Sequence, residues 1–180
     1  MRQIVKTIDA YRFDELGASA KENAMQNIEN KITVWNDWWE PVMEQQKDWL
    51  DKAGLHNAEI SFSLAYVQGD YCDIKCSSVD VKTLMKLVDP NKEIIDWEDD
   101  NLDINIEFRT SRFYPTTLQI FADDETYNKL DKALNDWLYC TEQDFYKEYM
   151  DEWEYYTSEE SIADLCECND YEFTKDGDLI

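Results

Sequence analysis

Outside its many carboxylates, the chain offers few side chains suited to chemistry. His56 is the only histidine, and it follows Gly54 in a polar turn with no nucleophile motif beside it. Because serine and cysteine hydrolases need a histidine that activates the nucleophile, the sequence does not favour either class. The four glycines are widely scattered, which excludes a glycine-rich phosphate loop and with it a dinucleotide or P-loop site.

Five cysteines are the next candidates, as metal ligands. Cys72 and Cys76 alternate within a predicted strand, which places both thiols on one face, and Cys166 and Cys168 form a second close pair. Neither spacing is the CxxC usual in zinc ribbons, so the sequence favours free thiols over a zinc site. With Cys140 the count is odd, and no secretory context accompanies it. We therefore predict reduced thiols, no metal and no cofactor.

Carboxylates are too abundant to single out a catalytic pair. The acidic run at 98–100 with Asp103 lacks the alternating ligands and central glycine of an EF-hand loop, so a solvated turn is the better interpretation. A hydrolase that uses a carboxylate pair near Asp70 and Asp73 stays open as an alternative. Because nothing distinguishes these acids from the others, we predict that the protein is not an enzyme.

The charge of the chain indicates the kind of partner it binds. There are 41 Asp and Glu against 17 Lys and Arg, for a formal net charge of −24. A protein this acidic repels nucleic acid and anionic membranes, so we predict a basic nucleic-acid-binding protein as the partner, without direct binding to nucleic acid or membrane. Hydrophobic residues at 43% and aromatic residues at 14% indicate that the chain nevertheless folds.

The negative charge is concentrated in the second half of the chain. Residues 1–88 carry a net charge of −4 and residues 89–180 one of −20, and residues 142–172 hold 12 acids and one base, Lys147. Along the predicted helix the acids recur about every 4 Å, close to the roughly 3.4 Å per charge of one DNA strand. We predict that the partner binds ten residues: Glu142, Asp144, Glu148, Asp151, Glu152, Glu154, Tyr155, Glu159, Glu160 and Asp164.

A solvated surface that only keeps the protein soluble is the rival interpretation. Apart from Lys147, four residues before Asp151, the acids have no lysines four residues away to compensate them, so they repel one another and lower stability. An uncompensated repulsion favours a binding role over simple solubility. Tyr146, Tyr155 and Tyr156 lie among the acids and are suited to contact a partner.

Hydrophobic alternation predicts an α+β fold: an antiparallel sheet of about four strands with packed helices and a long acidic C-terminal helix. Strands are expected at 4–11, 59–67, 71–77, 102–108 and 117–122, and the last four of these form the sheet. Gln68-Gly69-Asp70 is the expected hairpin turn between the strands at 59–67 and 71–77.

Helical periodicity predicts helices at 20–32, 38–53, 80–88, 124–156 and 157–165. Ser19 and Glu22 match a capping box at the start of the first helix, and Gly54 supplies the stop of the second. The tail is expected to form a small hairpin around Asp176-Gly177. Since no linker or repeat is visible, we predict a single domain over 1–180, with a near-neutral half at 1–88 and an acidic half at 89–180.

Five short segments, spread along the chain, carry a family resemblance. They are residues 11–24 (YRFDELGASAKENA), Trp38-Trp39-Glu40, Gln68-Gly69-Asp70, residues 156–163 and residues 171–177. Together they resemble a family of small acidic phage-encoded proteins, and the resemblance implies a phage origin. By its size and charge the chain also looks like the phage DNA mimics that block restriction enzymes or CRISPR nucleases.

Charge and resemblance together predict a phage-encoded inhibitor of a host nucleic-acid-targeting defence nuclease. The expected target is a CRISPR effector, most plausibly Cas9, or a restriction enzyme, and the inhibitor would act as an anti-CRISPR DNA mimic that blocks DNA binding. Because no apolar run approaches the roughly 20 residues of a bilayer span and no signal peptide is visible, we expect it in the cytoplasm of the infected bacterial host. The alternative is a phage regulatory or antitoxin-like protein that binds a basic host protein without nucleic-acid mimicry.

Overall fold

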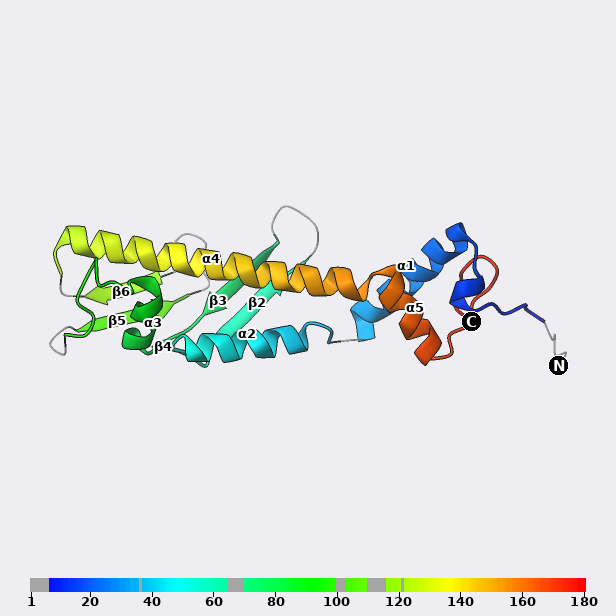
Figure 1. The fold of residues 1–180 in the computed structure, drawn as a ribbon, viewed down its shortest axis with the longest axis horizontal. Helices are drawn as coiled ribbons and strands as arrows, with labels where there is room; N and C mark the ends of the chain where they lie inside the picture. Colours follow the sequence, from blue (N-terminus) through cyan, green and yellow to red (C-terminus); the bar gives the residue numbers. More distant parts are fainter. Residues whose placement is uncertain (1–6, 36, 65–69, 100–102, 110–115, 121) are drawn as a thin grey trace, which may run out of the picture. The chain divides into compact units, whose positions relative to one another are not determined.

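The computed structural model describes residues 7–35, 37–64, 70–99, 103–109, 116–120 and 122–180 (Figure 1). The chain divides into two compact units: residues 1–39 with 151–180 form unit 1, and residues 40–150 form unit 2. Neither boundary coincides with the change in charge at residue 88. The single domain over 1–180 stays a prediction.

Helices and small antiparallel strand pairs together make an α+β protein, as predicted. In chain order the elements are η1 (Phe13–Glu15), α1 (Ala18–Trp35), α2 (Glu40–Lys52), β1 (Leu55–His56), β2 (Glu59–Ser63), β3 (Tyr71–Lys75), β4 (Ser78–Val79), α3 (Val81–Val88), β5 (Ile104–Phe108), β6 (Thr116–Ile120), α4 (Asp124–Tyr156) and α5 (Glu159–Cys168). The long helix α4 has the bounds that its apolar stripe predicts.

The strands pair as separate two-stranded sheets, so the predicted single sheet of about four strands is wrong. β2 pairs with β3 and β5 with β6, both antiparallel, as predicted. In the part of the chain that the structure describes, the backbone pairing between the two hairpins is an isolated bridge, in which Cys76, the residue after β3, and Phe108 of β5 exchange two hydrogen bonds. Further along β3, the Ile74 N–H donates to Glu142 Oε1 of α4 at 3.0 Å. The Glu142 side chain thus takes the hydrogen bond of the Ile74 N–H, which a neighbouring strand would need in order to pair with this edge of β3.

Two further differences concern short or terminal segments. β1 pairs with β4 over two residues each, and strands this short have no alternation from which to predict them. The predicted strand at 4–11 is wrong where it can be checked, because residues 7–10 are not a strand and Tyr11 forms an isolated bridge with Phe173. Residues 4–6 and the predicted turn residues Gln68 and Gly69 lie outside the described residues.

The start of α1 also differs from the prediction. α1 begins at Ala18, because the Lys21 N–H already donates to the Gly17 carbonyl at 2.9 Å, a helical i to i−4 hydrogen bond. Ser19 therefore lies inside the first turn, and its capping box with Glu22 is wrong. A side-chain oxygen serves this purpose earlier in the chain, where Glu15 Oε2 accepts the backbone N–H of Arg12 at 2.8 Å before η1.

Local signals place the C-terminal ends of α2 and α3 close to their predicted positions, while α2 begins two residues and α3 one residue later than predicted. α2 ends at Lys52, and Gly54 takes φ +92° just after it. A Cβ at Gly54 would lie 2.8 Å from the carbonyl oxygen of Asp80, so glycine is required there. Asp80 in turn caps α3, since its carboxylate accepts the Thr83 N–H at 3.3 Å and the Thr83 Oγ1–H at 2.8 Å.

In unit 2, α4 packs against the β2–β3 pair and α2 (Figure 1). The ring of Phe62 on β2 stacks on Tyr149 with centroids 3.9 Å apart, and Gln46 Nε2 of α2 donates to Glu148 Oε2 at 2.8 Å. The buried residues of α4 recur every three or four positions, which confirms the apolar stripe: Leu130, Leu134, Leu138, Thr141, Phe145 and Tyr149.

In unit 1, the tail folds back on itself as the predicted hairpin. Gly177 N–H donates to the Thr174 carbonyl at 3.0 Å, and Thr174 N–H donates to the Asp178 carbonyl at 2.7 Å. Phe173 is fully buried and meets Phe13 edge to face, with centroids 6.2 Å apart. No helix among the described residues is both long and apolar enough to span a bilayer.

Candidate interaction surface

The acids of residues 151–180 lie almost entirely on the surface of unit 1. Of the 11 Asp and Glu in this segment, ten are exposed and Glu152 is half-buried, while Lys175 is its single base. Among the described residues, Glu159 is the one acid of this segment in an ion pair, with Lys21 Nζ at 3.4 Å. Unit 1 therefore presents many carboxylates to solvent with little internal compensation.

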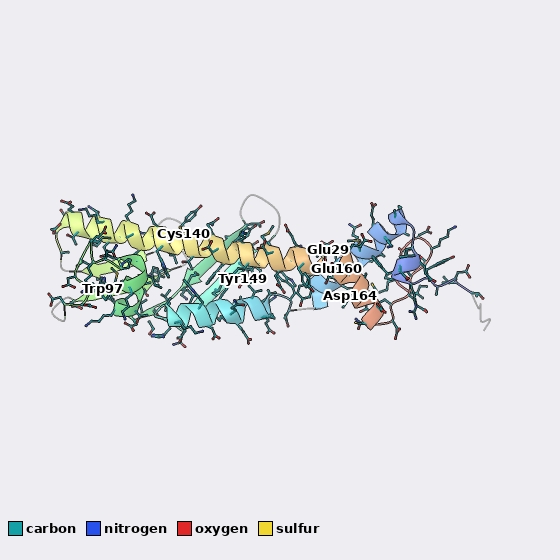
Figure 2. The ribbon with its side chains drawn as sticks, in the orientation of Figure 1. Glu29, Trp97, Cys140, Tyr149, Glu160 and Asp164 are labelled. Carbon is teal, nitrogen blue, oxygen red and sulfur yellow. The ribbon has the colours of Figure 1, made fainter. Side chains whose placement is uncertain are left out.

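Helix α5 aligns part of this surface. Ser158 caps the helix by accepting a backbone N–H, and the buried side chains of Ile162 and Cys166 fix which face turns inward. The opposite face carries exposed acids at i, i+4 and i+7, spaced by about 6 and 4.5 Å along the axis. These acids, of which Figure 2 labels the first two, are Glu160, Asp164 and Glu167.

A cavity of about 220 Å³ opens beside this face of α5. Arg12 is the one base in its lining, and Phe13 and Tyr171 contribute aromatic rings. Burial raises the pKa of the Cys166 thiol in the same wall to about 11, so this sulfur stays neutral near pH 7. The acids that line the cavity are Asp14, Asp164, Glu167, Asp170 and Glu172. Carboxylates beside aromatic rings suit a cationic side chain.

The C-terminal end of α4 adds to the surface of unit 1. Asp151 and Glu154 are exposed there. Tyr155 exposes 65% of its surface and meets Tyr156 edge to face, with centroids 5.9 Å apart. An exposed tyrosine among carboxylates offers contact area with little loss of side-chain entropy on binding.

The other three predicted partner-binding residues belong to unit 2, and they differ in their exposure to solvent. Asp144 and Glu148 are exposed on α4. Glu142 is half-buried, with its carboxylate turned toward β3 to accept the Ile74 N–H, so it is not part of an exposed line of charge. Glu142 and Glu148 both lie three residues from the buried Phe145, and they differ in their partners, since Glu142 accepts a backbone N–H of β3 and Glu148 accepts the side-chain amide of Gln46 in α2.

Burial and neighbouring carboxylates shift the pKa values of the groups around Glu142. Burial, followed by the charge of Asp73, raises the pKa of Glu142 to about 7, although the hydrogen bond from Ile74 opposes the shift. Burial, with the charges of Glu142, Asp73 and Glu148, raises the pKa of the Cys72 thiol to about 12. The surroundings of this thiol are therefore negative, and Cys72 is not an activated nucleophile.

Two buried polar groups near these acids carry unpaired atoms. In the described part of the chain, Tyr149 Oη and Gln46 Oε1 are enclosed and have no hydrogen-bond partner. Burial, then the charges of Cys72 and Glu148, raises the pKa of the Tyr149 phenol. Neither residue stands out in the sequence, because Tyr149 resembles the other members of the apolar stripe and no motif distinguishes Gln46.

The described residues weighed for catalysis lie in separate contacts. His56 Nδ1 lies 2.7 Å from Asp51 Oδ1 in an exposed pair. Burial, the charge of Asp70 and a hydrogen bond to it raise the pKa of the Tyr146 phenol, so Asp70 contacts α4. Over the described residues, no group of three or more His, Cys, Asp or Glu side chains is arranged to hold a metal ion. All five cysteines are free thiols, as predicted.

Comparison with known proteins gives no relative: no family model, no curated protein and no solved structure matches this chain.

Proposed function

We propose that this protein is a phage-encoded, non-enzymatic inhibitor that occupies the nucleic-acid groove of a host defence nuclease in the cytoplasm of the infected bacterium. The expected target is a CRISPR effector, with Cas9 as the first to test, or a restriction enzyme. The observation that carries the proposal is the exposure of ten carboxylates in residues 151–180, with one ion pair to the rest of unit 1 among the described residues.

The physical reason lies in what such a surface attracts. Lysines and arginines that bind phosphates can bind carboxylates instead, because phosphate and carboxylate groups are both anionic hydrogen-bond acceptors. The acids on α5 recur at 4.5 to 6 Å along the axis, which is of the same order as the charge spacing of DNA. The long-range field also speeds association with a basic groove. The cavity lined by Asp164 and Tyr171 would receive one cationic side chain of the partner.

The test compares two variants of equal charge. The first neutralises exposed acids of unit 1: Asp151→Asn, Glu154→Gln, Glu160→Gln and Asp164→Asn. The matched control neutralises exposed acids of unit 2, two Glu and two Asp as before: Glu40→Gln, Glu44→Gln, Asp48→Asn and Asp136→Asn. Each protein competes with a labelled DNA duplex for a purified Cas9–guide RNA complex and for a restriction enzyme, at several salt concentrations.

We expect wild-type protein to displace the duplex, with an affinity that falls as salt rises. The unit 1 variant should lose roughly tenfold or more, since each exposed charge contributes up to about 1 kcal/mol, while the control changes less than about threefold. Equal losses in both variants would mean that net charge alone matters and would refute a localised surface. Failure of wild-type protein to displace DNA from either enzyme would refute the proposal and favour a regulatory binder of another basic protein.

A further inference from the structure

The cavity beside α5 is lined by acids that have no partners in the part of the protein that the structure describes. They come from three segments of unit 1: Asp14 from η1, Asp164 and Glu167 from α5, and Asp170 and Glu172 from the tail. None of these five carboxylates forms an ion pair or a side-chain hydrogen bond with another described residue. The cavity of about 220 Å³ is many times larger than the roughly 15 Å³ needed for one water molecule, so it has room for a side chain.

The backbone holds the C-terminal end of α5 and its acids in place. The Tyr171 N–H donates to the Cys166 carbonyl at 2.9 Å. The Asp170 N–H donates to the Glu167 carbonyl at 3.3 Å, and the two hydrogen bonds form a Schellman motif. Asp170 takes φ +50° there, in the left-handed region where glycine is the usual residue. A carboxylate therefore lines the cavity at a position where glycine would be more stable.

Aromatic rings and bases complete the surroundings of the cavity. Lys31 Nζ lies 5.4 Å from the ring centroid of Tyr171. Lys21 Nζ lies 5.3 Å from the ring centroid of Phe13, so both rings of the lining already interact with a cation of the chain. Phe13 is buried and Tyr171 is half-buried, so Tyr171 is the ring that a ligand reaches. With Arg12 the two lysines make three bases against five acids, which leaves the cavity negative.

We infer that this cavity binds the guanidinium group of an arginine on the partner and prefers it to the ammonium group of a lysine. A guanidinium group is planar, so it stacks on the ring of Tyr171 while its N–H donors point outward, in its own plane, toward carboxylates from more than one segment. An ammonium group has three donors, is more strongly hydrated and does not stack. The inference rests on the proposed function for the identity of the partner, because grooves that bind phosphates use arginines for bidentate contacts.

The test titrates three small probes into the full chain: the Nα-acetyl amides of arginine, lysine and citrulline. Citrulline has nearly the shape of arginine without its charge. Proton–nitrogen NMR follows the backbone signals of Ala163 and Tyr171, which lie in the wall of the cavity.

Three variants show where a probe binds. The cavity variant, Asp164→Asn with Glu167→Gln, removes two carboxylates of the lining. Its matched control, Asp151→Asn with Glu160→Gln, makes the same chemical changes on exposed acids of unit 1 that do not line the cavity. Asp170→Gly removes another carboxylate of the lining. Because glycine suits the left-handed position, this variant should keep or raise the midpoint of urea denaturation, so that a loss of binding is not a loss of folding.

We expect the arginine probe to shift both signals saturably, with a dissociation constant on the order of 1 mM, because a single side chain buries little surface. The lysine probe should bind at least roughly threefold more weakly, and the citrulline probe should not bind. The cavity variant and Asp170→Gly should each weaken binding of the arginine probe by roughly threefold or more, while the control changes it by less than about twofold.

Equal affinity for the arginine and lysine probes, or no saturable shift, would overturn the inference. An equal weakening in the cavity variant and its control would do the same. Failure of the proposed function is a separate result, because displacement of DNA tests it and these probes do not. If wild-type protein displaces DNA but does not bind the arginine probe, the cavity inference fails alone. If it binds the probe but displaces no DNA, the cavity inference holds and the basic partner is another protein.

Discussion

Gly177→Ala should strongly destabilise unit 1, and the structure gives the size of the effect. Gly177 has φ +88°, in the left-handed region, where an alanine costs roughly 1 kcal/mol or more relative to glycine. An added Cβ would lie 2.1 Å from the carbonyl oxygen of Ala20 in α1. The backbone fixes the positions of both atoms, so no side-chain rotation relieves this close contact. The tip of the tail hairpin must therefore move away from α1.

That movement breaks specific contacts. Asn23 Nδ2 donates to the Asp176 carbonyl at 2.8 Å, and Asn27 Nδ2 donates to the Gly177 carbonyl at 3.2 Å. Each hydrogen bond contributes roughly 1 kcal/mol, so with the cost of the left-handed conformation we expect a loss of about 3 kcal/mol. The comparison variant is Gly17→Ala, because an added Cβ there meets nothing within 4 Å. Its effect should stay under about 1 kcal/mol.

Urea denaturation of the full chain followed by circular dichroism measures the free energy of unfolding, and hydrogen exchange locates the change. The Phe173 amide, which donates to the Tyr11 carbonyl at 2.9 Å, should lose protection in Gly177→Ala and keep it in Gly17→Ala. If Gly177→Ala lay within about 0.5 kcal/mol of wild type with Phe173 protection unchanged, the close contact between the tail and α1 would be refuted.

Two further predictions concern single side chains. Tyr149→Phe should leave stability unchanged or raise it by about 1 kcal/mol in urea denaturation, because the buried hydroxyl has no hydrogen-bond partner among the described residues. A loss above about 1 kcal/mol would show that the hydroxyl is bonded. Asp80→Ala should cost about 1 kcal/mol through loss of the α3 cap. Hydrogen bonds from Thr83 lower the Asp80 pKa below 3.8. The stabilisation by this cap is therefore present above pH 3.8 and is lost as pH falls through the lowered pKa. If Asp80→Ala cost as much stability at about pH 2 as at neutral pH, this account would be wrong.

Much of the secondary structure could be predicted because the signals are local. The apolar stripe predicted α4 with its observed bounds, and alternation predicted the β2–β3 and β5–β6 hairpins. Asp80, Ser158, Gly54 and Gly177 act within one or two turns of the backbone, so their roles as caps and turns follow from residue type and position.

The errors arose where the outcome depends on distant residues. Four alternating segments have the same pattern whether they form one sheet or two, so the sequence does not show which strands pair. In the structure the Ile74 N–H of β3 donates to Glu142, which lies 68 residues later in the chain. The start of α1 was misplaced because a capping box and a first helical turn use the same residue types, and only the backbone bond from Lys21 to Gly17 distinguishes them.

The sequence by itself determined the charge of the protein, its asymmetry and the segment that carries it, because composition and position need no fold. Tertiary structure alone decided which acids are available to a partner. Asp164 and Glu142 are the same kind of residue in the sequence, yet packing exposes the first on α5 and turns the second toward β3. Helical phase and the burial of neighbouring side chains fix that direction, since each carboxylate follows the face on which its backbone places it.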